Sequence, residues 1–412
     1  MRNRHPELLI PASSLEVLKT AVMFGADAVY IGGEAFGLRA KAKNFSMEDM
    51  KEGVRFAHDH GARVHVTVNI LAHNDDLEGA AEYLKELKEI GPDALIIADP
   101  AIFMLAKEIC PEIERHVSTQ ANNTNYGTFN FWWNLGAKRV VTARELSLKE
   151  IKEIRAHIPE EMEIESFIHG AMCISYSGRC LLSNFFTGRD ANQGACTHPC
   201  RWKYSVVEET RPGEYMPVYE NERGTYIFNS KDLCMIEHIP EMIDAGIDSF
   251  KIEGRMKTAL YVATVARTYR KAIDDYLEDP KKYEANMPWY KDQISNCTYR
   301  QFTTGFYFGK PGDESQIYDS NTYIKEYTYL GIIGGIKDGM YRIEQRNKFS
   351  VGETIEIMKP DGQNVEVTVE KIIDEDGQEQ ESAPHPKQVL YVALSGEASV
   401  YDILRRQEGV TE

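Results

Sequence analysis

Short runs of apolar, often β-branched residues alternate with stretches of helical spacing through residues 1–275. Helical spacing is clearest at 47–60, 77–90 and 148–157. Eight runs are candidate strands, at 7–11, 27–32, 63–69, 93–99, 115–120, 138–143, 163–169 and 248–254. Alternation of this kind requires parallel strands joined by crossover helices, so the sequence predicts a (β/α)8 barrel. An open doubly wound sheet is the alternative, although no G-x-G-x-x-G motif follows the first strand.

Glycines recur at the ends of the predicted helices. Gly25, Gly91, Gly136 and Gly246 each stand shortly before a candidate strand. A glycine that adopts a left-handed conformation ends the preceding helix and turns the chain into the next strand. We therefore expect these four positions to close helices of the barrel.

The length and the change in pattern predict two domains. A chain of 412 residues is too long for one ordinary domain. We assign residues 1–285 to the (β/α)8 barrel, 286–321 to a linker segment and 322–412 to a small all-β barrel. The β domain is expected from short strands at 331–334, 340–344, 353–357, 364–369 and 388–392, with a turn at 360–363 and a flexible acidic loop at 374–387.

Composition narrows the class of protein. The 42% hydrophobic and 27% charged residues are typical of a globular enzyme. Residues 1–6 lack the apolar core of a secretory signal, and no run of 18 apolar residues occurs. These features predict a cytoplasmic protein with no membrane association. The net charge of −17 is unfavourable for binding nucleic acid, so any such binding requires a local basic patch.

Four of the seven cysteines, Cys173, Cys180, Cys196 and Cys200, lie in one 28-residue window. The spacing is C-x6-C-x15-C-x3-C, within Gly-, Ser-, Asn- and Arg-rich sequence. Thiols that converge from a loop in a reduced compartment indicate a metal centre rather than disulfides. Spacing alone leaves structural zinc and an iron–sulfur cluster about equally suitable.

The cysteine window begins just after the seventh candidate strand, in an insertion of about residues 170–230 that includes a candidate hairpin at 202–225. Enzymes with a (β/α)8 barrel keep their active sites at the carboxyl ends of the strands. Asn69, Gln120 and Glu253 also follow strand ends, so we expect them on the same rim as the cysteines.

The sequence lacks the standard catalytic motifs of hydrolases and NTPases. No H-E-x-x-H, G-x-S-x-G or Walker motif is present. A thiol protease remains conceivable through a Cys–His pair, either Cys173 with His169 or Cys196 with His198. Four clustered thiols nevertheless exceed what one nucleophile needs.

The segment Glu165-x-Phe-x-His-Gly-Ala-x-Cys173-x-x-x-x-Ser-Gly-x-Cys180 resembles the signature of peptidase family U32. Leu38-Arg-Ala-Lys-Ala-Lys-Asn-Phe and Phe250-Lys-Ile-Glu-Gly-Arg-Met match that family as well, and the resemblance spans essentially the whole chain. The family name implies a collagenase-like protease. Its better-understood branches are iron–sulfur proteins that hydroxylate tRNA wobble uridine, ribosomal RNA cytidine or a ubiquinone precursor.

The stretch from Gly188 to Trp202 is similar to the tRNA branch of the family. This resemblance implies formation of 5-hydroxyuridine at the wobble position, with a 4Fe–4S cluster and with prephenate as the hydroxyl donor. It implies the tRNA anticodon arm as a partner and leaves room for a related U32 subunit. It also favours the cluster over zinc. Cys173, Cys180 and Cys196 are the expected ligands, with Cys200 as the fourth and Cys234 as its alternative, because some branches use that position.

Roles for the remaining residues stay open between function and structure. His169 could shuttle a proton or act as a hydrogen-bond partner, and Glu165 and Glu253 could be bases or pair with arginines. Candidate substrate-binding residues are Arg39, Lys41 (with Lys43), Arg179, Arg201 (with Arg189), Asn69 and Gln120. An arginine could clamp a carboxylate of prephenate. Phe185, Phe186 and Trp202 could stack an extruded base or simply pack.

The sequence thus predicts a tRNA wobble-uridine hydroxylase. A collagenase-like peptidase and a non-catalytic RNA-binding iron–sulfur protein are the alternatives.

Overall fold

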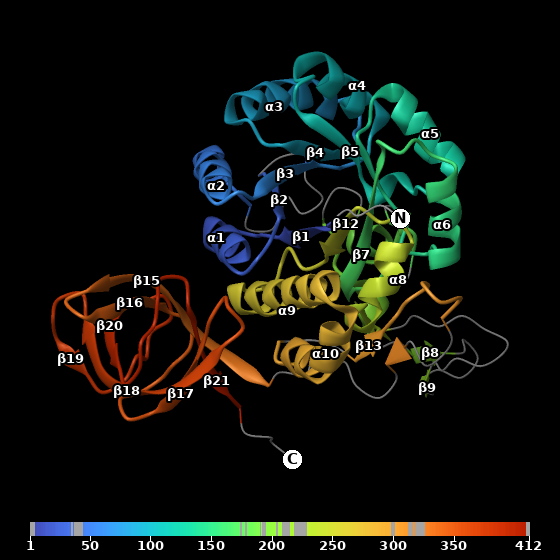
Figure 1. The fold of residues 1–412 in the computed structure, drawn as a ribbon. Coiled ribbons are helices and arrows are strands. Elements are labelled where there is room, and N and C mark those ends of the chain that lie inside the picture. Colours follow the sequence, from blue (N-terminus) through green and yellow to red (C-terminus); the bar gives the residue numbers. More distant parts are fainter. Residues whose placement is uncertain are drawn as a thin grey trace.

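The computed structural model comprises two barrels joined along one helix (Figure 1). It describes residues 5–33, 36, 44–173, 175–177, 179–189, 191, 195–202, 205–207, 215–217, 229–297, 301–311, 316–317 and 326–408. Side chains are described for these residues except in 201, 205–207, 215–217, 229–230 and 316–317. The predicted pair of domains, a (β/α)8 barrel followed by a small β barrel, is confirmed.

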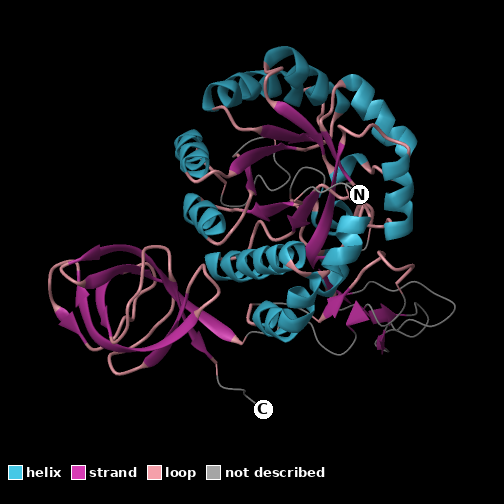
Figure 2. Cartoon of the chain, in the orientation of Figure 1, coloured by secondary structure: helices cyan, strands magenta, loops and turns pink. Residues whose placement is uncertain are grey.

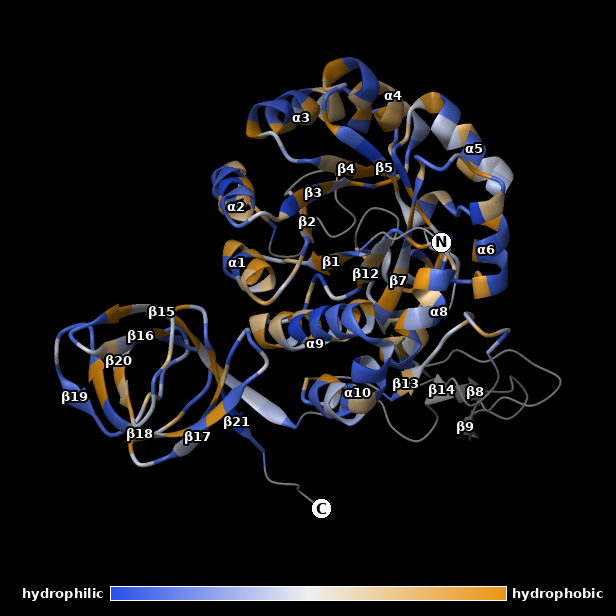
Figure 3. Cartoon of the chain, viewed as in Figure 1, coloured by the Kyte–Doolittle hydropathy of each residue, from blue (hydrophilic) through white to orange (hydrophobic). Residues whose placement is uncertain are grey.

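Eight parallel strands close the first barrel. Neighbours around the barrel are β1 (Glu7–Pro11), β2 (Ala28–Gly32), β3 (Arg63–Val68), β4 (Ala94–Ile97), β5 (Glu114–Val117), β6 (Arg139–Val141), β7 (Glu163–Ala171) and β12 (Ser249–Ile252). Strand β12 pairs in parallel with both β7 and β1, which closes the ring. Apolar residues line these strands, whereas the outer faces of the helices are largely hydrophilic (Figure 3).

Helices surround the strands (Figure 2). They are α1 (Leu15–Met23), α2 (Met47–Asp59), α3 (Asp76–Ile90), α4 (Pro100–Ile109), α5 (Tyr126–Leu135), α6 (Leu148–Ala156), α8 (Ile239–Asp244) and α9 (Ala259–Glu278). Local sequence sets their limits: Ser147 and Glu150 form a capping box that begins α6. Gly91 and Gly136 end α3 and α5 in left-handed conformations, as predicted.

The insertion after β7 is built from short elements. It contains α7 (Leu182–Thr187), the 3-10 turn η3 (Pro199–Arg201), and the predicted hairpin as β8 (Ser205–Val207) paired with β9 (Tyr215–Pro217). Strand β11 (Asp232–Cys234) then returns antiparallel to the end of β7, and β13 (Phe302–Thr303) extends this edge. A further pair joins β10 (Asn229–Ser230) to β14 (Gln316–Ile317).

A helix occupies part of the expected linker. Helix α10 (Pro280–Ser295) crosses residue 286, and its Tyr290 hydroxyl donates to Asp275 Oδ2 of α9 at 2.6 Å. Pro288 lies inside this helix. A proline removes a backbone hydrogen bond inside a helix, so its presence here gives no local signal for the helix that the structure shows.

The C-terminal barrel is a closed ring of six antiparallel strands. Its members are β15 (Tyr327–Lys337), β16 (Met340–Gln345), β17 (Thr354–Met358), β18 (Asn364–Asp374), β20 (Val389–Leu394) and β21 (Ile403–Gln407). The acidic stretch 374–387 differs from the expected loop: β19 (Glu379–Gln380) pairs with β18, and Ala383 is fully buried. A turn at Asp374 and Gly377 reverses the chain between these strands, so the charged residues belong to an ordered hairpin.

The two barrels share a packed interface. Arg267 of α9 is buried and donates to the carbonyls of Lys359 and Gln363 and to Asn364 Oδ1 of the β barrel. Glu16 of α1 accepts a hydrogen bond from Arg346. Apolar residues of the β barrel, including Tyr329 and Met358, join the hydrophobic core of the first barrel. The C-terminal domain is therefore fixed against α1 and α9.

Candidate functional site

A cavity of about 450 Å³ lies at the carboxyl ends of the barrel strands. Its walls come from strand ends, and its cover comes from the cysteine-rich insertion. The described lining includes Tyr30, Thr67, Asn69, Ser118, Gln120, Arg144, Glu145, Phe167, Met172, Arg189, Lys251, Glu253 and Arg255. This is the rim where a (β/α)8 barrel assembles its active site.

All four cysteines of the window line this cavity, which we call the cysteine cavity. Cys173 and Cys196 are exposed, and Cys180 and Cys200 are half-buried. Four thiols on one cavity are the soft donor set that zinc and iron–sulfur clusters both accept. Among the described residues, no three of these sulfurs lie within 4.8 Å of one another. A single tetrahedral zinc ion, with bonds of about 2.3 Å, would hold its thiolates roughly 3.8 Å apart. The four thiols share one cavity, and their donor set suits either kind of metal group.

Cys234 lies elsewhere. It is on β11, lines a different cavity, and its sulfur is 3.7 Å from the hydroxyl of Tyr269. Burial raises the pKa of the Cys234 thiol to about 11. A thiol that resists ionisation is a poorer metal ligand, because the thiolate is the ligating form.

Glu165 is buried beneath the cavity. Its Oε1 accepts from Lys251 Nζ at 2.6 Å, and its Oε2 accepts from Arg139 Nη1 at 3.2 Å. Lys251 reaches the cavity floor, where its ammonium lies 4.4 Å from the centroid of the Tyr30 ring. Both carboxylate oxygens of Glu165 are thus bound by cations, and Glu165 holds Lys251 in place at the cavity floor.

His169 faces away from the cysteine cavity. Its ring is 1% exposed, and Nδ1 lies 3.4 Å from the Tyr269 hydroxyl. Burial, aided by the positive charge of Lys257, lowers the pKa of His169 to about 3. A neutral imidazole of such low basicity is suited to a structural hydrogen bond, and it is a weak general base near pH 7.

Glu253 does line the cavity, and its main partner is a residue that sequence reasoning missed. Arg144 Nη2 donates to Glu253 Oε2 at 3.1 Å, and Arg144 Nη1 donates to the carbonyl of Ala171. The Arg144 guanidinium also stacks 3.9 Å above the centroid of the Phe167 ring. These contacts join the loops after β6, β7 and β12 into one wall.

Glu145 was also missed. It lines the cysteine cavity, and burial raises the pKa of its carboxyl. A carboxyl with a raised pKa inside a cavity is typical of a proton donor. The signal was available, because Arg144 and Glu145 directly follow the sixth candidate strand, where the rule for rim residues should have been applied.

The predicted polar residues Asn69 and Gln120 both line the cavity. Asn69 Nδ2 donates to the Ser118 hydroxyl at 3.4 Å. Gln120 is 4% exposed, and its Oε1 has no hydrogen-bond partner among the described residues. A buried amide oxygen without a protein partner is suited to accept a hydrogen bond from a ligand.

Known proteins share this chain's pattern over nearly its full length. The model of "Peptidase family U32" matches residues 13–317, and that of the "Peptidase family U32 C-terminal domain" matches 325–405. The chain belongs to peptidase family U32. This confirms the resemblance seen in the sequence.

Three curated relatives show where the chain lies within family U32. "tRNA hydroxylation protein P1" of Bacillus subtilis is 42% identical, over 98% of this chain and 95% of the relative. "tRNA hydroxylation protein P" of Escherichia coli is 39% identical, over 92% of this chain and 91% of the relative. The "23S rRNA 5-hydroxycytidine C2501 synthase" of E. coli is 40% identical, over 66% of this chain and 40% of the relative.

Some residues expected at this U32 site cannot be placed there. Arg39 and Lys41 lie outside the described residues, and only the backbone of Arg201 is described. Arg179 is exposed and is not among the residues that line the cavity. Its neighbour in the insertion, Arg189, does line the cavity, and it forms no ion pair with any described residue.

Exposed aromatic side chains gather beside the cavity of this U32 chain. Phe185 is 81% exposed, and Phe186 and Trp202 are each 44% exposed. The rings of Phe185 and Phe186 meet edge to face, with centroids 5.2 Å apart. The alternative that these residues pack in the core is therefore wrong for Phe185.

A layer of charged residues fills the barrel interior of this U32 chain below the cavity. Arg139 pairs with Glu7, Glu163 and Glu165, and we call these four residues with Lys251 the ionic layer. Burial opposes ionisation of Glu7, but the charge of Arg139 outweighs it and holds the pKa of Glu7 below its ordinary value. His65 and His116 lie beside Glu165, and burial lowers the pKa of both imidazoles.

No helix among the described residues is long and apolar enough to span a membrane.

Proposed function

We propose that this chain is an RNA-modifying enzyme that hydroxylates the wobble uridine of tRNA to 5-hydroxyuridine. The observation that carries the proposal is the cysteine cavity, which joins four thiols to the catalytic rim of the barrel. The near full-length similarity to proteins named for tRNA hydroxylation supports RNA as the substrate.

Cys173, Cys180, Cys196 and Cys200 would hold a 4Fe–4S cluster. Their place on one cavity supports a metal centre, and the resemblance to the tRNA branch of the family favours a cluster over a single zinc ion. When bound, such a cluster supplies electron-transfer or Lewis-acid chemistry at the rim. Cys234 stays the alternative fourth ligand, although its position in another cavity and its raised pKa favour Cys200.

Prephenate as the hydroxyl donor would enter the same cavity. A dicarboxylate needs cationic partners. Arg189, from the insertion after β7, and Lys251, from β12, both line the cavity. Arg189 has no acidic partner among the described residues, whereas Lys251 is held by Glu165. Arg189 would therefore anchor one carboxylate, while Lys251 contributes positive charge at the floor.

Positioning of the base would fall to neutral groups. Gln120 offers at the wall an amide oxygen without a hydrogen-bond partner among the described residues, and uridine carries an imide N–H that could donate to it. Glu145 would deliver or hold a proton, because burial keeps its carboxyl more protonated than an exposed one. Phe185 and Phe186 would stack bases of the anticodon loop outside the cavity.

The decisive test compares Cys173→Ala with Cys110→Ala in a strain that lacks the gene and its paralogues. Cys110 is a buried thiol of α4's end that lies outside the cavity, so it controls for loss of a cysteine. We expect mass spectrometry of tRNA nucleosides to show 5-hydroxyuridine derivatives with wild type and Cys110→Ala. With Cys173→Ala we expect at least a roughly hundredfold loss, since removal of one ligand empties the site.

Anaerobic purification with iron, sulfide and zinc analysis completes the test. Four irons and four sulfides per chain are expected for a 4Fe–4S cluster. One zinc per chain without iron would refute the cluster. Wild-type protein that leaves tRNA unmodified in the complemented strain would refute the hydroxylase.

A further inference from the structure

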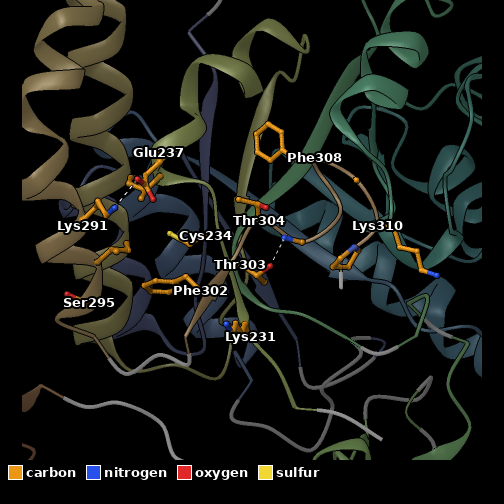
Figure 4. Close-up of a pocket in the computed structure, with 15 residues that line it drawn as sticks. Lys231, Cys234, Glu237, Lys291, Ser295, Phe302, Thr303, Thr304, Phe308 and Lys310 are labelled. Atoms are coloured by element: carbon orange, nitrogen blue, oxygen red, sulfur yellow. Dashed lines mark hydrogen bonds and ion pairs between the residues drawn. The ribbon is translucent and has the colours of Figure 1, made fainter. Parts of the chain in front are cut away.

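A second cavity, of about 590 Å³, is lined by residues from three segments, 231–237, 291–295 and 302–311 (Figure 4). It lies between β11, the turn η4 (Ile236–His238), α10 and the segment from β13 to Pro311. Three lysines line it, so we call it the lysine cavity: Lys231, Lys291 and Lys310.

The lysine cavity is positively charged in a strongly acidic chain. Glu237 is the one carboxylate among its described lining residues, and it is paired with Lys291 at 2.9 Å. Lys231 and Lys310 form no ion pair with any described residue. The cavity is therefore lined by two lysines without a described acidic partner, on a molecule whose net charge is −17. A local excess of this kind attracts anions, whatever the total charge.

Only a thin wall separates the two cavities. Asp232 of β11 pairs with Ala171 at the end of β7, and Ala171 lines the cysteine cavity. Gly305 lines the lysine cavity, and a Cβ atom added to it would lie 3.3 Å from Cε of Met172, which lines the cysteine cavity. The two cavities therefore share a wall formed by residues of β7, β11 and the segment after β13.

The polar lining suits a phosphodiester. Thr303 lines the cavity with Thr304, and its Oγ1 accepts from the backbone N–H of Gly305 at 3.1 Å, so hydroxyl groups are part of the lining. The aromatic rings of Phe302 and Phe308 also line the cavity and offer apolar surface to a sugar or base. In Figure 4 Phe302 and Thr303 lie near Cys234, with Lys231 and Lys291 on either side.

We propose that the lysine cavity binds backbone phosphates of the RNA strand next to the nucleotide held in the cysteine cavity. The inference rests on the proposed function for its substrate class. It explains how so acidic a chain holds a polyanion: contacts are concentrated beside the reacting nucleotide. Phosphate contacts of this kind fix register and orientation, whereas the base is recognised in the other cavity.

The test measures binding of an anticodon stem-loop RNA to the full chain over a range of salt. We expect Lys231→Gln/Lys310→Gln to weaken binding roughly tenfold at low salt. We also expect the slope of log K against log salt to fall in magnitude by roughly 1.4, because two phosphate contacts to a single strand are lost. The matched control is Lys51→Gln/Lys149→Gln, two exposed lysines on α2 and α6 with the same change in net charge. It should bind like wild type.

Three outcomes separate the possibilities. Unchanged affinity and slope in the Lys231→Gln/Lys310→Gln variant, with 5-hydroxyuridine still formed, would overturn this inference alone. A reduced slope in a protein that modifies no tRNA would support the phosphate site while refuting the hydroxylase. Calorimetric titration with inorganic phosphate that depends on the two lysines, while RNA binding does not, would also overturn the inference and assign a small-anion site.

Discussion

The ionic layer inside the barrel and the rim above it use charged side chains in opposite ways. In the layer, Arg139 is 2% exposed and contacts three carboxylates, and Glu165 has a cation on each oxygen. At the rim, Arg189 has no acidic partner and the Gln120 amide oxygen has no hydrogen-bond partner in the part of the chain that the structure describes. A charged side chain whose partners are all protein groups has no atom left to bind a ligand. A side chain without such partners can still bind one.

The comparison teaches how to separate structural from functional residues in this chain. Glu165 and His169 looked catalytic because they belong to the family signature, yet both are buried and lie off the cavity surface. Burial without access indicates a role in holding the rim in place. Three variants or conditions test this division, from the largest expected effect to the smallest.

The largest effect is expected from the rim thiols. Cys200→Ser should abolish cluster loading, because Cys200 lines the cavity with the other three cysteines. Cys234→Ser should retain iron and sulfide after anaerobic reconstitution, since Cys234 lies in the lysine cavity. The reverse result, with cluster loading lost only in Cys234→Ser, would show that Cys234 and not Cys200 is the fourth ligand.

An intermediate effect is expected from the layer. Arg139→Met leaves Glu7, Glu163 and Glu165 without their shared guanidinium, which should lower the free energy of unfolding by about 3–5 kcal/mol. Arg189→Met, the same chemical change at the rim, should shift it by no more than about 0.5 kcal/mol. Urea denaturation measures both. Equal losses of unfolding free energy in the two variants would contradict the distinction between a structural ionic layer and a ligand-binding rim.

The smallest effect is expected from the share of one histidine, His169, in the loss of stability on acidification. Burial holds the pKa of His169 at about 3, below the value near 6.5 of an unfolded chain. The unfolded state therefore binds more protons below pH 6.5, and stability falls as pH decreases through that range. Each such histidine should cost about 1.4 kcal/mol per pH unit.

The measurement is urea unfolding at several pH values between 6.5 and 5, where carboxylates stay largely ionised. His65 and His116 contribute in the same direction, because their pKa values are also lowered by burial. His169→Gln should reduce the change in unfolding free energy with pH by the contribution of one histidine. An unchanged dependence would show that His169 has the same pKa in the folded and the unfolded protein.

Much of the fold could be predicted because its signals are local. Alternating strand and helix patterns gave all eight barrel strands, and glycines such as Gly91 and Gly136 marked helix ends. Strand β11 has three residues, too few for a pattern, and its pairing with β7 depends on the tertiary fold. Helix α10 was hidden by Pro288, and β21 was missed near the end of the chain.

The site was predictable to the extent that its residues follow strands. That rule placed Asn69, Gln120 and Glu253 on the cavity, and the cysteine spacing placed the thiols beside them. It could not show that His169 turns toward Tyr269, because side-chain direction at a strand end depends on neighbouring elements. It also could not reveal the lysine cavity, which is assembled from β11, α10 and the loop after β13.

The closure of the first barrel has a consequence for its synthesis. Strand β12 joins β7 to β1, and Ser249 pairs with Glu7 across 242 positions of sequence. Until residue 252 has left the ribosome, β1 and β7 remain open sheet edges that are exposed to misfolding or aggregation. Contacts so distant in sequence form slowly. The rim is thus completed late, and any metal centre held there would be loaded after translation of the barrel.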